Sequence, residues 1–275
     1  MQLKTKQGKT TSILGLAAND EMDIDCLQIA LEAGINYFFF YNSQYSNFLN
    51  GLKTISLTNR EQIIIATGSE TRNIGILRSY IEEVLRKLNT DYIDIFYLEY
   101  ISPSYDGAEV EAALDELYSL KEKGILRYVG VTTHNRPVAL KFIDSDRSQG
   151  VFLRCDVLMH RYNIAHRKAE EDILPRAKKA NIPVIAFTST RWGSLLNGHP
   201  DWKYPPAKAT DCYRYVLQNP AIHLTLTSPN NSKQLQENLA ALNNSQLTPQ
   251  EINHWRSYGD LIYGNGQDAF ETQWS

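Results

Sequence analysis

Short apolar runs alternate along the whole chain with segments of helical periodicity. The runs are rich in β-branched and aromatic residues, which favour strands. Each is followed by a segment whose apolar residues recur at the spacing of one helix face. The eight predicted strands are residues 11–17, 36–40, 62–67, 92–100, 126–132, 151–159, 182–188 and 222–227.

Helices are predicted between and after these strands. The first begins after Asp20 and Asp23, whose charges favour a helix N-terminus, and ends at Gly34. The others span residues 46–57, 72–88, 109–123, 137–143, 169–180, 207–217 and 232–242. This alternation predicts an α/β protein of the (β/α)8 or TIM-barrel type. Since such a barrel takes about 250 residues, one domain over residues 1–275 is expected.

One run, DYIDIFYLEY at residues 91–100, is apolar along its length and ends on a carboxylate. Its aromatic and β-branched content is typical of a strand buried on both faces, in a parallel sheet wrapped by helices. In such sheets the chemistry gathers where the strands finish. Glu99, at this end, is therefore a candidate functional residue.

Composition narrows the class of protein. The chain has 275 residues, of which 43% are hydrophobic, and a formal net charge of -3. That charge would attract neither nucleic acid nor an anionic membrane, so we expect neither partner. Cys26, Cys155 and Cys212 show no metal-ligand or disulfide spacing, so no metal site is expected. With no apolar signal core at the N-terminus, a cytoplasmic location is expected.

Five motifs follow one another in a characteristic order. They are LEAGIN at residues 31–36, DYIDIFYLEY at 91–100, GILRYVGVTT at 124–133, MHRYN at 159–163 and SPNNSKQLQENLAAL at 228–242. Together they resemble the aldo-keto reductase superfamily over nearly the whole chain. The resemblance implies a barrel with its active site at the carboxyl ends of the strands, an oxidoreductase activity, and NADP or NAD as cofactor.

Reductases of that superfamily use an Asp, a proton-donating Tyr, a Lys and a His at the barrel mouth. By resemblance, the Asp position is Phe39, the Lys position is Gly68 and the His position is Glu99. The Tyr position is Gln44, or Tyr45 if one residue is inserted. The tetrad is therefore degenerate, and Tyr45 and Glu99 remain as catalytic candidates.

Two roles are open for Glu99. Ionisable residues at a barrel mouth are enriched for function. The structural alternative is a carboxylate paired with a base at a neighbouring strand end. The candidate bases are His160, Arg161 and Arg191.

The resemblance also implies a dinucleotide site. The implied cofactor residues are Thr132, Phe187, Ser228, Asn230, Gln234 and Asn238. Phe187 can stack on a ring, whereas Thr132 and Met159 replace residues that hold the carboxamide in the superfamily. Because Asn230 and Asn231 carry no charge for a 2′-phosphate, we expect weak binding with little preference between NADP and NAD.

The substrate pocket is expected to contain Phe40, His160, Arg191 and Trp192. Residues 38–41 are all aromatic, which suits a planar apolar ligand or, alternatively, core packing. An Arg beside a Trp suits a clamp on a carboxylate or phosphate, or a structural pair. The tail, residues 248–275, predicts one helix followed by Phe270 and Trp274, which either fold over the mouth or pack on the flank.

Two functional hypotheses follow. The first is a divergent NAD(P)-linked oxidoreductase that acts on a carbonyl or enone. The second is a reductase-derived protein without redox activity, which binds a small-molecule ligand, regulates a partner, or performs non-redox acid–base chemistry. The family motifs favour the first hypothesis and the replaced tetrad favours the second. The sequence carries no signal for the substrate or the oligomeric state.

Overall fold

The structure is a computed structural model in which residues 2–144, 152–243 and 246–264 are described. Its strands form a closed barrel in which each strand pairs in parallel with the next and the last pairs with the first. The strands are β1 (Leu14–Ala17), β2 (Tyr37–Phe39), β3 (Ile64–Ser69), β4 (Ile93–Leu98), β5 (Leu126–Thr133), β6 (Val157–Arg161), β7 (Val184–Phe187) and β8 (Ile222–Thr227). The predicted barrel is confirmed.

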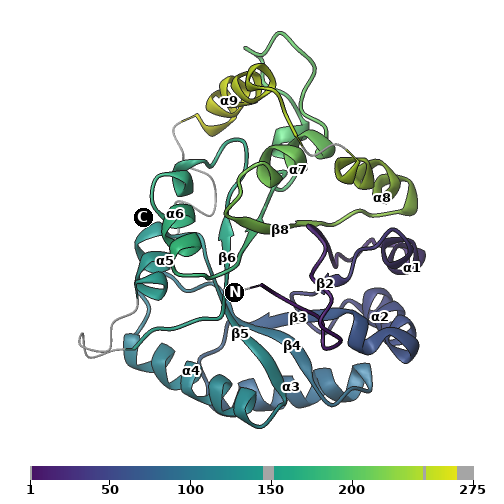
Figure 1. Cartoon of the computed structure of the whole chain (residues 1–275), viewed down its shortest axis with the longest axis vertical. Helices are drawn as coiled ribbons and strands as arrows, with labels where there is room; N and C mark the ends of the chain where they lie inside the picture. Colours follow the sequence, from purple (N-terminus) through teal and green to yellow (C-terminus); the bar gives the residue numbers. More distant parts are fainter. Residues whose placement is uncertain (1, 145–151, 244–245, 265–275) are drawn as a thin grey trace.

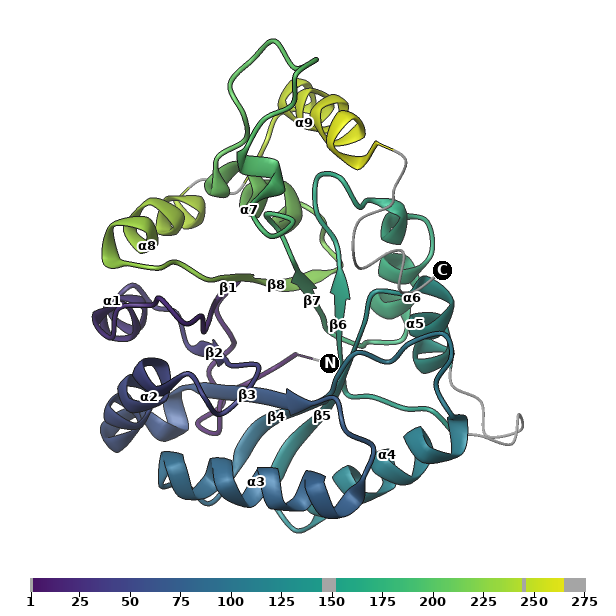
Figure 2. The ribbon, with the colours of Figure 1, turned by 180° about the vertical axis from the view of Figure 1, so that it is seen from behind.

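Helices follow the strands and surround the barrel, as Figures 1 and 2 show from opposite sides. Within the described ranges the α-helices are α1 (Asp25–Glu32), α2 (Ser46–Asn59), α3 (Ile74–Leu88), α4 (Gly107–Glu122), α5 (Arg136–Ile143), α6 (Ile173–Lys179), α7 (Ala209–Leu217), α8 (Ser232–Leu239) and α9 (Pro249–Tyr263).

Several elements are shorter than the sequence pattern predicts, and at two of them side chains take over backbone hydrogen bonds. β1 starts at Leu14 rather than at residue 11, since Ser12 and Asn36 bond each other through side chain and backbone. The helix predicted over 169–180 divides into a short 3₁₀ turn and α6, because the Asp172 side chain accepts a bond from the Ile173 N–H and caps α6 there.

Large side chains fill the interior of the barrel. Tyr37 and Tyr97 are fully buried, and their hydroxyl oxygens lie 2.9 Å apart. Gly130 makes room for them, because a β-carbon at this position would lie 2.3 Å from the Tyr97 ring. The interior is thus a packed core, and the main cavity lies beyond the strand ends.

Charged residues close the amino-terminal end of the strands. Asp94, near the start of β4, is fully buried and accepts hydrogen bonds from Arg60 at 2.7 Å and Arg127 at 2.5 Å. Two guanidinium groups compensate one buried carboxylate, which otherwise would be strongly destabilising. This end of the barrel is therefore occupied by structural ion pairs.

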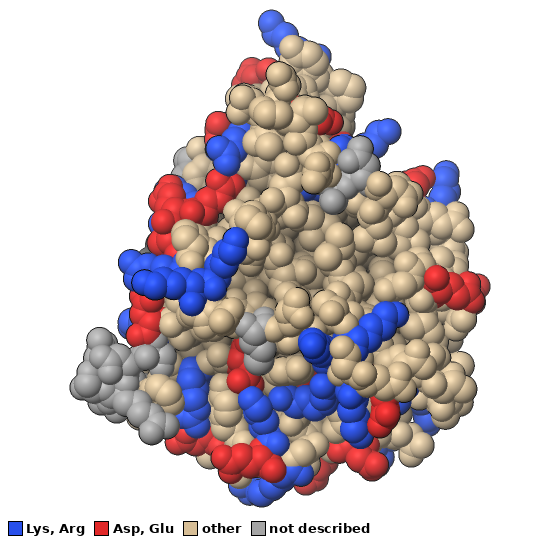
Figure 3. All heavy atoms as spheres, in the orientation of Figure 1, with Lys and Arg blue, Asp and Glu red and all other residues tan. Residues whose placement is uncertain are grey.

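Charges of both signs are mixed on the surface. Figure 3 shows basic and acidic side chains interleaved along the lower and left edges, while uncharged residues cover much of the centre and top. Among the described residues, no helix has the length and apolar character needed to cross a membrane.

Helix α9 lies on the loops that follow β6 and β7. The Tyr258 hydroxyl donates to the Leu195 carbonyl at 2.8 Å. Gly259 allows close approach to the β6 loop, because a β-carbon there would lie 2.2 Å from the Ile164 carbonyl oxygen. Phe270 and Trp274 lie outside the described residues, so the two positions considered for the tail stay predictions.

Candidate active site

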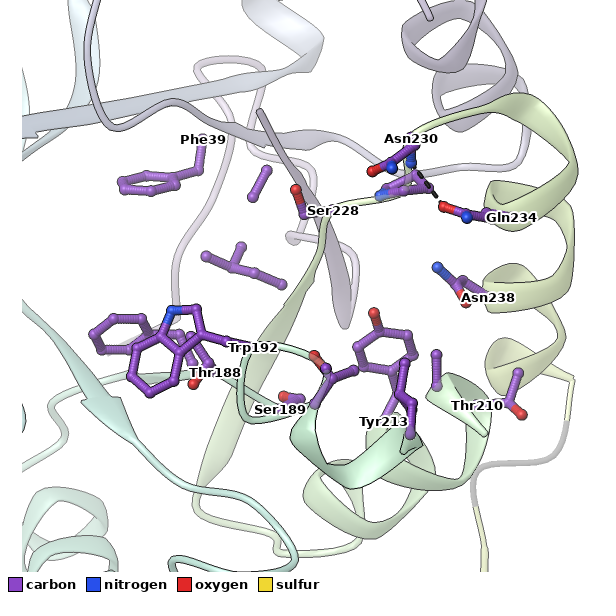
Figure 4. Close-up of a pocket in the computed structure, with 18 of the residues that line it drawn as sticks. Phe39, Thr188, Ser189, Trp192, Thr210, Tyr213, Ser228, Asn230, Gln234 and Asn238 are labelled. Atoms are coloured by element: carbon purple, nitrogen blue, oxygen red, sulfur yellow. Dashed lines mark hydrogen bonds between the residues drawn. The ribbon is translucent and has the colours of Figure 1, made fainter. Parts of the chain in front are cut away.

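A cavity of about 1530 Å³ opens at the carboxyl ends of the strands. It is elongated: Figure 4 shows Phe39 and Trp192 at one end, and Asn230, Gln234 and Asn238, beside α8, at the other. Its lining includes Ala17, Phe39, Tyr41, Tyr45, Glu99, Tyr100, Thr132, Met159, Phe187, Trp192, Ser228, Asn230, Gln234 and Asn238. Most of the predicted catalytic and cofactor residues are thus brought together.

Glu99 lines this cavity with a buried carboxyl group. Its side chain is 1% exposed, and neither carboxyl oxygen has a hydrogen-bond partner among the residues that the structure describes. Burial raises the pKa of Glu99 well above its usual range, and the nearby Glu70 adds to the rise while Arg72 opposes it. Burial therefore favours the protonated form of Glu99, which can donate a hydrogen bond into the cavity.

Because Gly68 has no side chain, it leaves room for the side chain of Glu99. A β-carbon at position 68 would lie 2.7 Å from both Cγ and Oε1 of Glu99, and 2.4 Å from the carbonyl oxygen of Tyr97. Contacts below about 3 Å are not tolerated by packed atoms without movement. The space that a side chain at position 68 would need is thus filled here by the side chain of Glu99.

Backbone and side-chain hydrogen bonds fix the end of β4. The Arg72 guanidinium donates to the Glu99 carbonyl oxygen at 2.7 Å and to the Glu70 carbonyl oxygen at 2.6 Å. The Tyr100 N–H donates to the Thr132 hydroxyl at 2.9 Å, and Tyr100 has a left-handed φ of 49°. Thr132, predicted to contact a cofactor, therefore also holds the turn that follows Glu99.

Tyr45 lines the same cavity but is not activated as an acid. Burial raises the pKa of its phenol above the usual value, and the carboxyl groups of Asp20 and Glu99 raise it further. A phenol with a raised pKa is a poor proton donor at neutral pH. Of the two catalytic candidates, Glu99 is the better acid.

Aromatic rings surround Glu99 at this end of the cavity. Tyr41 and Tyr100 meet edge to face with ring centroids 5.7 Å apart. The Trp192 ring is stacked on His134 at 5.8 Å, and Trp192 is 46% exposed at the opening. These flat apolar walls suit a planar ligand with one hydrogen-bond acceptor.

Three predicted pocket residues lie elsewhere, and the prediction is wrong for them. Phe40 is fully buried in the helix layer against Phe48, because successive strand residues face opposite sides and Phe39 takes the inner side. His160 follows Met159 and likewise points away from the cavity, with Nδ1 bonded to the Thr133 carbonyl at 2.7 Å.

Arg191 is the third predicted pocket residue that does not line the main cavity. It is 7% exposed, and its guanidinium donates to the Ile262 carbonyl oxygen instead of reaching the cavity. The turn after β7, in which Arg191 and Trp192 both have left-handed φ values of 51° and 49°, directs Trp192 to the cavity and Arg191 to α9. The ion pair considered for Glu99 is also absent from the described residues.

The other end of the cavity offers neutral polar groups at the start of α8. Asn231 caps the helix by accepting from the Gln234 N–H at 3.0 Å, and the Gln234 side chain accepts from the Asn230 N–H at 2.8 Å. Asn238 donates to the Thr227 hydroxyl at 3.0 Å. Glu237 also lines this part of the cavity. Its negative charge makes this end of the cavity unfavourable for the 2′-phosphate of NADP.

These features fit a nicotinamide dinucleotide. The same cavity is lined by Phe187 and by the start of α8, and a helix N-terminus favours the phosphates of a dinucleotide. Ser228, Asn230, Gln234 and Asn238 would hold the adenosine half, while Phe187 would face the nicotinamide. Among the described residues, no cluster of His, Cys, Asp and Glu is arranged to bind a metal ion.

Part of the lining was not singled out by the sequence pattern. It includes Thr188, Ser189, Thr190, Leu196, Ala207, Lys208, Thr210 and Tyr213. Most belong to the long connection between β7 and α7, whose length was the one available signal. A connection much longer than its neighbours at the carboxyl end of a barrel is a common place for binding residues.

Residues 7–211 match the model of the Aldo/keto reductase family. The chain therefore belongs to this family. Among curated proteins it is 25% identical to the uncharacterized oxidoreductase YqkF of Bacillus subtilis, over 94% of this chain and 90% of that protein. It is 24% identical to L-galactose dehydrogenase of Arabidopsis thaliana, over 84% of this chain and 81% of that protein.

Solved structures share the fold. The aldo-keto reductase AKR11C1 of Bacillus halodurans, in a holo form, superposes with a TM-score of 0.74 at 18% identity, covering 94% of this chain and 95% of its own. An aldo/keto reductase of Klebsiella pneumoniae, in complex with NADP and acetate, gives a TM-score of 0.73 at 16% identity with the same coverage.

Proposed function

We propose that the protein binds a nicotinamide dinucleotide along the main cavity and reduces a planar, conjugated carbonyl compound, with the protonated carboxyl of Glu99 as proton donor. The observation that carries this proposal is the burial of Glu99 at the cavity wall, with no hydrogen-bond partner among the described residues. A buried, unpaired carboxyl is costly unless it serves a ligand.

In the proposed reaction, each part of the site has a separate role. The nicotinamide, when bound, supplies the hydride that the substrate carbon accepts. The Glu99 O–H donates a hydrogen bond to the carbonyl oxygen and then releases its proton to that oxygen, which completes an alcohol. The carboxylate left on Glu99 is stabilised by the positive charge of Arg72. The aromatic rings of Tyr100 and Trp192 hold the conjugated plane.

The binding of a ligand without redox chemistry is the second candidate. It is favoured by the state of Tyr45, whose phenol pKa is raised, and by Gly68 in the position where the superfamily has a Lys. In this case the cavity would bind a planar small molecule, and Glu99 would serve only as a hydrogen-bond donor.

Cofactor titration followed by single-turnover kinetics tests the proposal. NADH and NADPH are titrated into the purified protein, and an aryl or α,β-unsaturated aldehyde is then mixed with the complex while reduced-nicotinamide absorbance is followed. We expect Glu99→Gln to lower the rate by about a hundredfold or more, with nearly unchanged dinucleotide affinity. Tyr45→Phe is the matched control and should retain most of the rate.

Two results would contradict the proposal. A rate that disappears in Tyr45→Phe and persists in Glu99→Gln would assign the proton to the phenol. Binding of a dinucleotide without any oxidation, across the aldehyde and enone panel, would favour the ligand-binding candidate instead.

A further inference from the structure

A second cavity, of about 470 Å³, lies at the carboxyl ends of β5 and β6. It is separate from the main cavity and is bordered by the first turn of α5, the loop before α6 and the end of α9. Neither the family motifs nor the proposed reaction uses it.

Basic side chains dominate the lining of the second cavity. Among the described residues that line it, Arg136, Arg161 and Lys168 are basic, and Asp172 is the single carboxylate. Arg136 is already engaged, because Asp172 binds its guanidinium at 2.8 Å and Glu171 binds it at 3.1 Å. The positive charge of Arg161 and Lys168 therefore exceeds the negative charge in the wall.

The histidine in the wall adds no negative charge. His160 is 1% exposed and its Nδ1 bonds to the carbonyl oxygen of Thr133, which fixes the ring. Burial lowers the pKa of His160 to about 4, and the neighbouring Arg161 contributes to this lowering. His160 is thus neutral at physiological pH, and the cavity keeps its excess of positive charge.

We propose that the second cavity is an oxyanion site that binds a carboxylate or phosphate group between Arg161 and Lys168. Guanidinium and ammonium groups form their strongest hydrogen bonds with such oxyanions. A neutral or cationic ligand would leave these charges uncompensated in a partly buried site.

His134 forms the partition between the two cavities. It lines the second cavity, and its ring lies 5.1 Å from Phe187 and 5.8 Å from Trp192, both of which line the main cavity. The Trp192 and His134 rings are stacked at 29°. An anion bound beside His134 should therefore change the fluorescence of Trp192.

Two sources can supply the oxyanion. One is a small anionic metabolite in solution. The other is the chain itself, since the sequence after Gly264 contains Asp268, Glu271 and the terminal carboxylate. The recognition chemistry is the same for both sources, and the experiment distinguishes them.

Calorimetric titration of the full-length protein with malonate and with inorganic phosphate is the test. We expect saturable binding that Lys168→Gln and Arg161→Gln each weaken by about tenfold or more. Lys208→Gln, which removes a cation from the main cavity instead, is the matched control and should leave anion affinity unchanged. The accompanying fluorescence change should vanish in Trp192→Phe.

The source of the oxyanion follows from a second protein, Asp268→Asn/Glu271→Gln. Binding to the unmodified protein supports a solution anion, whereas binding that emerges only in the double variant assigns the site to the chain's own carboxylates. Absence of binding in both proteins, or binding that is lost in Lys208→Gln and kept in Lys168→Gln, would overturn the proposal.

Discussion

The carboxyl group of Glu99 occupies the space that a side chain at position 68 would need, with Oε1 2.7 Å from the β-carbon position of Gly68. The two residues come from the ends of neighbouring strands, β3 and β4, whose register pairs Gly68 with Tyr97. The observed position of the Glu99 side chain is therefore incompatible with any side chain at position 68, unless one of the two moves.

Gly68→Ala should be destabilising for this reason. We expect a loss of about 1–3 kcal/mol in the free energy of unfolding, measured by urea denaturation, because the new methyl group meets Glu99 and the Tyr97 carbonyl. Gly75→Ala is the control: Gly75 is exposed in the first turn of α3, and a β-carbon there would meet only the Asn73 side chain, at 3.3 Å, so Ala should be less destabilising than at position 68. Equal effects of the two changes would contradict the packing relationship.

Restoring single residues of the superfamily tetrad should not create an efficient reductase of simple aldehydes. Phe39→Asp, Gly68→Lys and Glu99→His each supply one member of a group that works only as a unit. Lys at position 68 also collides with Glu99, so this variant should be less stable. Steady-state assays with simple aliphatic aldehydes provide the measurement. A large gain in reductase activity from any single change would contradict this expectation, because it would mean that the other members of the tetrad have functional equivalents in this protein.

Stability should depend on pH through Glu99. Because its pKa is raised in the folded state, the folded protein keeps a proton that the unfolded chain releases above about pH 4.3. The free energy of unfolding of the unmodified protein should therefore fall, relative to Glu99→Gln, by up to about 1.4 kcal/mol per pH unit from that pH up to the folded-state pKa. A difference that stays constant with pH would mean that Glu99 is ionised when folded.

Arg72 should limit the rise in the Glu99 pKa. Its positive charge favours the carboxylate, so Arg72→Gln should raise the Glu99 pKa further, measured by the infrared band of the protonated carboxyl across a pH series. The same change removes hydrogen bonds to the carbonyls of Glu70 and Glu99. Arg78→Gln, at an exposed ion pair with Glu116, is the control and should leave the band unmoved.

Dinucleotide binding should show little preference for a 2′-phosphate. Asn230, Asn231 and Gln234 are neutral, and Glu21 and Glu237 lie on the same side of the cavity. We expect affinities for NADH and NADPH within about tenfold, or about 1.4 kcal/mol, in fluorescence titrations. Asn230→Arg should shift the preference toward NADPH. A strong NADPH preference in the unmodified protein would contradict this and would point to Lys208, a cation in the cavity lining.

The sequence by itself determined the barrel and the place of its chemistry. The apolar runs of the strands and the helical spacing between them are local properties. The alternation of elements, the strand that ends at Glu99 and the cap of α9 at Thr248 therefore follow from neighbouring residues alone. Thr132, Phe187 and Ser228 lie where their strands end, as predicted.

Only the tertiary structure decided which of these side chains share a cavity. Phe40 and His160 each sit one position from a residue that faces the cavity, and a shift of one residue reverses the direction of a strand side chain. The fit of Glu99 against Gly68, and the burial that raises the pKa of Glu99, depend on the register of two strands that lie some thirty residues apart in the sequence. The charge of a carboxyl group is set by its surroundings, and those surroundings exist only once the barrel has closed.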